Sequence, residues 1–127
     1  MLVRDLMVKE VVTSKKDITV KECIDLLFKR YVGSVVVINK ERKVVGIFTE
    51  HDAVRIVAQN ISLDTPLEKV MSKNIHTVNE NTTFREAKNI MNLHKIKRLP
   101  VVNTEGQLIG LFSIRNLIEE ITELSEL

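Results

Sequence analysis

The heptapeptide "GIFTEHD", residues 46–52, returns 64 positions later as "GLFSIRN", residues 110–116. Each stretch ends an apolar run and then changes to hydroxyl and polar side chains. Ser or Thr followed three residues later by Asp caps a helix, because both side chains accept amide hydrogens. The same junction presents free amides and a positive dipole end, which suit a phosphate. We therefore expect a strand leading into a helix, twice, with capping and ligand binding both open.

The whole sequence matches itself without a gap when it is displaced by 64 residues, which indicates an internal duplication. The aligned identities run through both copies: Met7 with Met71, Thr13 with Thr77, Thr19 with Thr83, Glu22 with Glu86, Val37 with Val101, Asn39 with Asn103, Gly46 with Gly110 and Phe48 with Phe112. We expect repeat 1 at residues 1–60, a linker at 61–66 and repeat 2 at 67–127.

Each copy predicts the order strand, helix, strand, strand, helix after a short helical turn. The turns are "VRDLM" and "PLEKVM", and in the second copy Thr65 is the expected cap, with Pro66 at the first helical position. First strands are expected at residues 11–13 and 75–78. "SVVVI" and "LPVV" predict middle strands, which hairpins join to "KVVGIF" and "QLIGLF".

Helices are expected from Thr19 and Thr83, where Thr-x-x-Glu forms a capping box, and from Thr49 and Ser113. Helical spacing predicts their apolar faces: Val20, Ile24, Leu27 and Phe28; Ala53, Val54 and Val57; Leu117, Ile118 and Ile121.

Gly46 and Gly110 each interrupt an apolar strand, which predicts a bulge or the close approach of another group to the backbone. One copy of under about 60 residues buries little apolar surface. We therefore expect two βαββα repeats packed around a pseudo-two-fold axis, an α+β fold with function in the clefts between the repeats.

Composition narrows the function classes. The 127 residues are 44% hydrophobic and 28% charged, which is typical of a compact globular chain. A formal charge of +2 leaves no dense basic surface for a phosphate backbone, so nucleic acid is not a favoured partner. No apolar run approaches the roughly 20 residues of a membrane span, and "MLVRDLMVKE" lacks a signal-peptide pattern. We expect a cytoplasmic protein that does not contact a membrane.

The reactive side chains indicate no catalytic site. Cys23 is the single cysteine, and repeat 2 has Ala87 in its place, which predicts a small buried side chain. The three histidines, His51, His76 and His94, show no close ligand spacing, so we expect no metal. With no nucleophile paired to a base and no carboxylate pair, the sequence does not predict an enzyme.

The ordered motifs resemble the cystathionine β-synthase (CBS) domain pair, or Bateman module. They are the repeat starts "VRDLM" and "VM", the middle strands "GSVVVI" and "RLPVVN", and G-x-x-[ST]-x-x-[DN] at the closing helices. No one of these motifs is specific, whereas the ordered set at a constant offset is. The resemblance covers nearly the whole chain.

This resemblance implies two clefts that bind adenosine compounds such as AMP, ADP, ATP or S-adenosylmethionine, with no further cofactor. It places phosphate at Thr49 and ribose at Asp52, and correspondingly Ser113 and Asn116 in repeat 2. Asn116 departs from the usual Asp, so we expect weaker ribose binding there. Adenine is implied near Val12, Thr13, Gly33 and Ser34 in one site, and near His76, Thr77, Arg98 and Pro100 in the other.

The densest basic run is "HKIKR", residues 94–98, and it has two readings. Cations at a helix C-terminus offset the negative dipole end. The resemblance instead implies that Lys97 and Arg98 reach a nucleotide phosphate, and repeat 1 lacks these side chains, so the two clefts should differ.

Three functions stay open from the sequence. The first is a regulatory sensor in which bound nucleotide changes the packing of the repeats and an unknown partner protein reads the change; the family commonly forms homodimers. The second is a ligand-independent oligomerisation module in which "TEHD" and "SIRN" only cap helices. The third is nucleic-acid binding through Lys95, Lys97 and Arg98.

Pro100, which the resemblance places near adenine, also has a structural interpretation, as a residue that marks the end of a strand.

Overall fold

The computed structural model describes residues 1–114, which form two compact units. The central unit is Val12–Ile75. The terminal unit joins Met1–Val11 to the chain from His76 onward. Each unit holds a three-stranded sheet with helices, so the chain has the expected mixed α+β fold with two repeats. The sequence repeats at 1–60 and 67–127 stay a prediction, and the compact units are composed differently because residues 1–11 pack with the second sheet.

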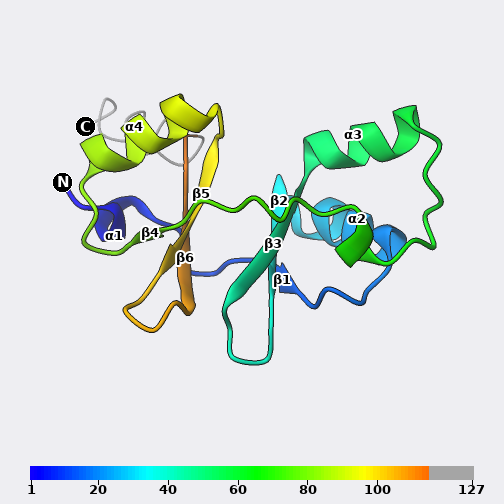
Figure 1. The fold of residues 1–127 in the computed structure, drawn as a ribbon, viewed down its shortest axis with the longest axis horizontal. Helices are drawn as coiled ribbons and strands as arrows, with labels where there is room; N and C mark the ends of the chain where they lie inside the picture. The colour runs from blue at the N-terminus through cyan, green and yellow to red at the C-terminus, as the bar shows by residue number, and fades with distance from the viewer. Residues whose placement is uncertain (115–127) are drawn as a thin grey trace. The chain divides into compact units, whose positions relative to one another are not determined.

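The central unit has the sheet order β1-β2-β3, in which β1 is parallel and β3 antiparallel to β2. Its helices α2 and α3 pack against β2 and β3 (Figure 1). Its elements are β1 (Thr13–Ser14), α2 (Val20–Arg30), β2 (Ser34–Ile38), β3 (Val44–Thr49), α3 (Glu50–Ala58) and the 3-10 turn η1 (Leu67–Lys69).

The terminal unit repeats this arrangement with the sheet order β4-β5-β6. Its described elements are α1 (Val3–Leu6), β4 (Val78–Asn79), α4 (Phe84–His94), β5 (Arg98–Val102) and β6 (Leu108–Ser113). The expected closing helix, with Leu117, Ile118 and Ile121, lies outside the described residues. Pro100 is buried in the middle of β5 and pairs with Leu111, so its interpretation as a strand end is wrong.

The helix caps follow the Thr signals. Thr19 begins α2 with a complete capping box to Glu22, and Thr83 accepts a hydrogen bond from the Glu86 amide at the start of α4. The turn before repeat 2 differs from expectation, because Pro66 occupies the cap position of η1 and makes no side-chain bond. The Thr65 carbonyl instead accepts a hydrogen bond from the Val20 amide, which ties this turn to α2.

The apolar faces are correct in position but not in every residue. In α2, Val20 and Leu27 are buried as expected, whereas Phe28 is 79% exposed. In α3, Val54 and Val57 are exposed and Ile56 is fully buried. The β2 strand on which these helices pack is buried from Ser34 to Val37, as its unbroken apolar run predicts.

Both strand glycines face a methionine from a segment that closes the sheet edge. Ser72 exchanges two backbone hydrogen bonds with Ile47 of β3, at 3.0 and 3.1 Å, and the preceding Met71 contacts the place where Gly46 would carry a Cβ. In the terminal unit Val8 pairs with Leu111 at 2.9 Å, and Met7 contacts Gly110 in the same way. The predicted close approach is confirmed, and the approaching group is a Met side chain rather than a ligand.

Substitution of Gly46 by Ala tests this packing. The new methyl group would overlap the Met71 side chain, so we expect a loss of about 1 to 3 kcal/mol in the free energy of unfolding. Met71→Ala opens that space and by itself costs about 2 to 5 kcal/mol. The double variant should lose less than the sum of the two, measured by urea unfolding.

The matched control combines Gly46→Ala with Met7→Ala. The Met7 sulfur lies beside Gly110 and not beside Gly46. These two losses should add. If the losses in the free energy of unfolding also add for Gly46→Ala with Met71→Ala, the steric explanation is contradicted.

Candidate functional site

The junction of β3 and α3 carries Thr49 and Asp52 in a closed capping box. Asp52 Oδ2 accepts hydrogen bonds from the Thr49 amide at 2.8 Å and from Thr49 Oγ1 at 3.2 Å. In return Thr49 Oγ1 accepts from the Asp52 amide at 3.3 Å. The cap predicted from "TEHD" is therefore present, and it engages one carboxylate oxygen with two donors. The second oxygen, Oδ1, is left facing Arg55.

The other residues implied for the first site lie beside this junction. Ser34, which is 4% exposed, is the antiparallel partner of Thr49, and the Gly33 carbonyl accepts a hydrogen bond from the Glu50 amide at 3.0 Å. On the other side of β2, the Val12 carbonyl accepts from the Val36 amide, and Thr13 pairs with Val36. The sheet thus gathers all six residues within the central unit: Val12, Thr13, Gly33, Ser34, Thr49 and Asp52.

Arg55 is a further polar residue here that the sequence reasoning did not single out. Its Nη2 lies 3.6 Å from Asp52 Oδ1 and donates a hydrogen bond of 2.8 Å to the Val70 carbonyl. The Arg55 side chain is 33% exposed and that of Asp52 is 16% exposed, so the pair is partly shielded from water. The sequence signal for this ion pair was the spacing of three residues between Asp52 and Arg55 on one helix.

The second set of implied residues lies in the terminal unit with the equivalent register. Arg98 pairs with Ser113, which is 4% exposed, and the Lys97 carbonyl accepts a hydrogen bond from the Ile114 amide at 3.3 Å. Pro100 lies further along β5, and Thr77 immediately precedes β4. Asn116 lies outside the described residues.

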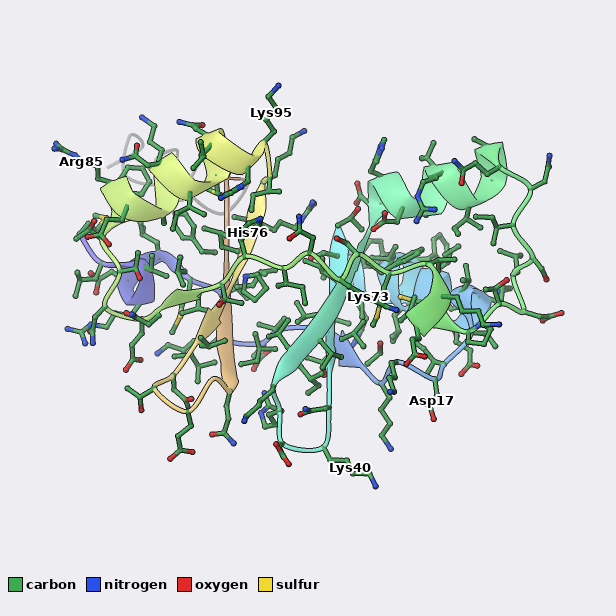
Figure 2. All side chains as sticks on the ribbon, in the orientation of Figure 1. Asp17, Lys40, Lys73, His76, Arg85 and Lys95 are labelled. Carbon is green, nitrogen blue, oxygen red and sulfur yellow. The ribbon has the colours of Figure 1, made fainter. Side chains whose placement is uncertain are left out.

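His76 stacks on His94 of α4, with ring centroids 3.7 Å apart and an angle of 18° between the rings. Sequence spacing did not indicate this contact, because it joins His76, which precedes β4, to the last residue of α4. Repeat 1 has Val12 and Arg30 in these positions. Figure 2 shows the neighbouring Lys95 extending away from the end of α4, where it adopts the left-handed helix cap.

A surface hollow of about 560 Å³ lies in the terminal unit, along β4, the start of α4 and the turn after β5. Thr77 borders it, but no other residue of the second implied set within residues 1–114 does. Its lining residues are Thr77, Val78, Asn79, Glu80, Asn81, Thr82, Glu86, Ile90, Val102, Asn103 and Thr104. Within residues 1–114 no group of three or more His, Cys, Asp or Glu side chains is placed to hold a metal ion.

Cys23 is fully buried in α2, as expected for a small core side chain. Burial and, to a smaller extent, the negative charge of Asp52 together raise the pKa of its thiol to about 12. At neutral pH the thiol is protonated, and the thiolate is the reactive form. Ala87, its counterpart in α4, is also fully buried.

The chain belongs to the CBS domain family, since the family model matches residues 3–59 and again residues 67–123. The two matches begin 64 residues apart, which is the offset of the internal duplication. In the part of the chain that the structure describes, every helix falls short of the length or apolar character that crossing a membrane requires.

Three other proteins are similar to this chain over most of its length. An uncharacterized 17.7 kDa protein of Acidianus ambivalens is 36% identical over 110 residues, which cover 87% of this chain and 66% of that protein. An inosine-5'-monophosphate dehydrogenase of Aquifex aeolicus is 37% identical over 109 residues, 85% of this chain but 22% of the enzyme. A CBS domain protein of Pyrobaculum aerophilum, solved in complex with AMP, matches with a TM-score of 0.87 and 29% identity over 100% of both chains.

The Cys23 thiol provides a test of burial beside the site. We expect iodoacetamide at pH 8 to react with the folded protein only as fast as it unfolds, and with the urea-unfolded chain as with an ordinary thiol of pKa about 8.5. The folded thiol keeps its proton up to about pH 12, whereas the unfolded thiol loses it earlier. The free energy of unfolding should therefore fall as pH rises through this window.

The control for the pH dependence is Cys23→Ala, which installs the residue found at position 87. In this variant the free energy of unfolding should fall less steeply with rising pH, because the thiol no longer contributes. Rapid alkylation of the folded wild-type protein at pH 8 would contradict the assignment of Cys23 to the core.

Proposed function

We propose that this chain is a regulatory module that binds an adenosine nucleotide, in the series AMP, ADP, ATP or S-adenosylmethionine, and transmits the bound state to a partner protein. The observation that carries the proposal is the convergence of Gly33, Ser34, Thr49 and Asp52 at the β3–α3 junction. Membership of the CBS domain family and the AMP complex of the Pyrobaculum aerophilum relative support the same ligand class.

The capping box is compatible with ribose binding at Asp52. A carboxylate offers about four lone-pair sites, and the two bonds from Thr49 use only Oδ2. Oδ1 lies 3.6 Å from Arg55, beyond ordinary hydrogen-bond length, and so keeps acceptor capacity for ribose hydroxyls. Thr49 and the start of α3 then receive phosphate, for which the helix N-terminus is favourable. Capping thus prepares the carboxylate for binding.

In the second site we propose that Ser113 and Asn116 take the roles of Thr49 and Asp52. Adenine lies near His76, Thr77 and Pro100, and Lys97 with Arg98 adds positive charge toward phosphate. Repeat 1 has Gly33 and Ser34 at the Lys97 and Arg98 positions, so the sites differ in charge and affinity. A weaker amide acceptor at Asn116 makes the first site the tighter one.

We propose further that the chain acts in the cytoplasm as a homodimer without catalysing a reaction. The alternative is a ligand-independent oligomerisation module, and the closed capping box is the observation that favours it. Under that alternative, Thr49 and Asp52 serve stability alone.

A thermal-shift measurement with Asp52→Ala and a matched variant separates the two functions. AMP at about 100 times its dissociation constant should stabilise the wild-type protein by roughly 2.7 kcal/mol, a rise of several degrees in Tm. Asp52→Ala and Glu22→Ala each remove the carboxylate of a capping box, so each should cost about 0.5 to 2 kcal/mol without ligand.

Only Asp52→Ala should lose the response to AMP, because Glu22 belongs to the cap of α2. GTP serves as the nucleotide control and should give a smaller rise. An unchanged Tm for the wild-type protein with every adenosine compound would favour the oligomerisation module. An equal AMP response in all three proteins would remove Asp52 from the site.

A further inference from the structure

One nitrogen of the Arg55 guanidinium group lies near two oxygen atoms. Nη2 donates to the Val70 carbonyl at 2.8 Å and lies 3.6 Å from Asp52 Oδ1. One cation thereby connects the carboxylate proposed to hold ribose with a backbone carbonyl 15 residues further along the chain. Hydrogen bonds from charged donors are stronger than neutral ones, so the Val70 contact is a substantial tie for that segment.

Val70 lies in the segment 67–72, which is held to the central unit at several points. The Leu67 amide donates to the Ile18 carbonyl at 2.8 Å, and the Met71 side chain fills the space above Gly46. Ser72 then pairs with Ile47 on the outer edge of β3. Lys73, labelled in Figure 2, follows directly. The segment therefore consists of the turn η1 and a short pairing with β3. Arg55 contacts its backbone, and Lys16 forms an ion pair with Glu68 at 3.0 Å.

The same segment leads by only a few residues to His76 and Thr77, where the second implied site begins. In the sequence of repeat 2, the position equivalent to Arg55 is Glu119. The arginine at this position is therefore not repeated in the second copy.

We propose that Arg55 is a positioning residue that couples occupation of Asp52 to the hold on segment 67–72, an inference that rests on the proposed function. Ribose hydroxyls that donate to Asp52 Oδ1 weaken the attraction of that oxygen for Arg55, whose Nη2 lies 3.6 Å away. The guanidinium group then keeps Val70 as its remaining acceptor and binds that carbonyl with better geometry. Ligand in the first site thereby tightens the segment that connects to the second.

Amide hydrogen exchange of the full chain tests the coupling, with AMP as the probe. The reporter is the Ser72 amide, which donates to the Ile47 carbonyl, and its rate is divided by that of the buried Val36 amide to remove global stabilisation. In the wild-type protein AMP should slow this relative rate by about threefold or more. Without ligand, Arg55→Met should speed it by about tenfold.

The variants separate the tie from general charge effects. Arg30→Met removes an exposed cation at the end of α2 and should behave as the wild type. Arg55→Met should bind AMP, measured by calorimetry, but show no slowing of the relative Ser72 rate. Adenosine, which lacks phosphate, should reproduce the slowing in the wild type, because the effect comes from ribose at Asp52.

The outcomes distinguish the coupling from the function on which it rests. If AMP binds the wild-type protein but leaves the relative Ser72 rate unchanged, or slows it equally in Arg55→Met, the coupling is overturned and the nucleotide site stands. If no heat of AMP binding is measured for the wild-type protein at millimolar ligand, both are overturned.

Discussion

The outer edge of each sheet is closed by a short segment with a methionine before its pairing residue, and much of the remaining structure depends on that contact. Met71 and Ser72 close β3, and Met7 and Val8 close β6. An exposed edge strand carries unpaired amides and carbonyls, so this pairing protects the sheet. It also explains why a compact unit and a sequence repeat do not coincide, since residues 1–11 precede the first repeat's sheet but pack on the second.

The segment that closes the sheet edge also contributes to the contacts around the β3–α3 junction. Gly46 leaves room for Met71, and three residues later the strand passes directly into the Thr49 cap. Cap, edge segment and Arg55 therefore form one continuous set of contacts around Asp52. A ligand that engages Asp52 acts on a partly buried carboxylate whose neighbours are already ordered, which lowers the entropy lost on binding.

The sequence predicted the elements whose signals are local. Thr19, Thr49 and Thr83 begin helices as expected because a hydroxyl cap acts within one turn. The apolar run of β2 likewise predicted a buried strand. The duplication was predicted from the constant offset of 64 residues. The family model confirms it, because its two matches begin at residues 3 and 67.

Features that depend on tertiary contacts were not predictable in this way. Phe28 and Val57 fit a helical apolar stripe yet lie exposed, because the sheets select a face rotated toward Cys23 and Ile56. The role of Gly46 required knowledge of Met71, which is 25 positions away. The stack of His76 on His94 and the link from Arg55 to Val70 join separate elements, and periodicity carries no signal for such contacts.

The central claim is that Asp52 accepts hydrogen bonds from the ribose of an adenosine nucleotide. The most direct measurement compares the calorimetric dissociation constants of AMP and 2'-deoxy-AMP for the wild-type protein and for Asp52→Ala. We predict that the wild type prefers AMP by about tenfold, since one charge-assisted hydrogen bond is lost with the hydroxyl, and that Asp52→Ala shows nearly no preference. The same preference in both proteins would contradict the account.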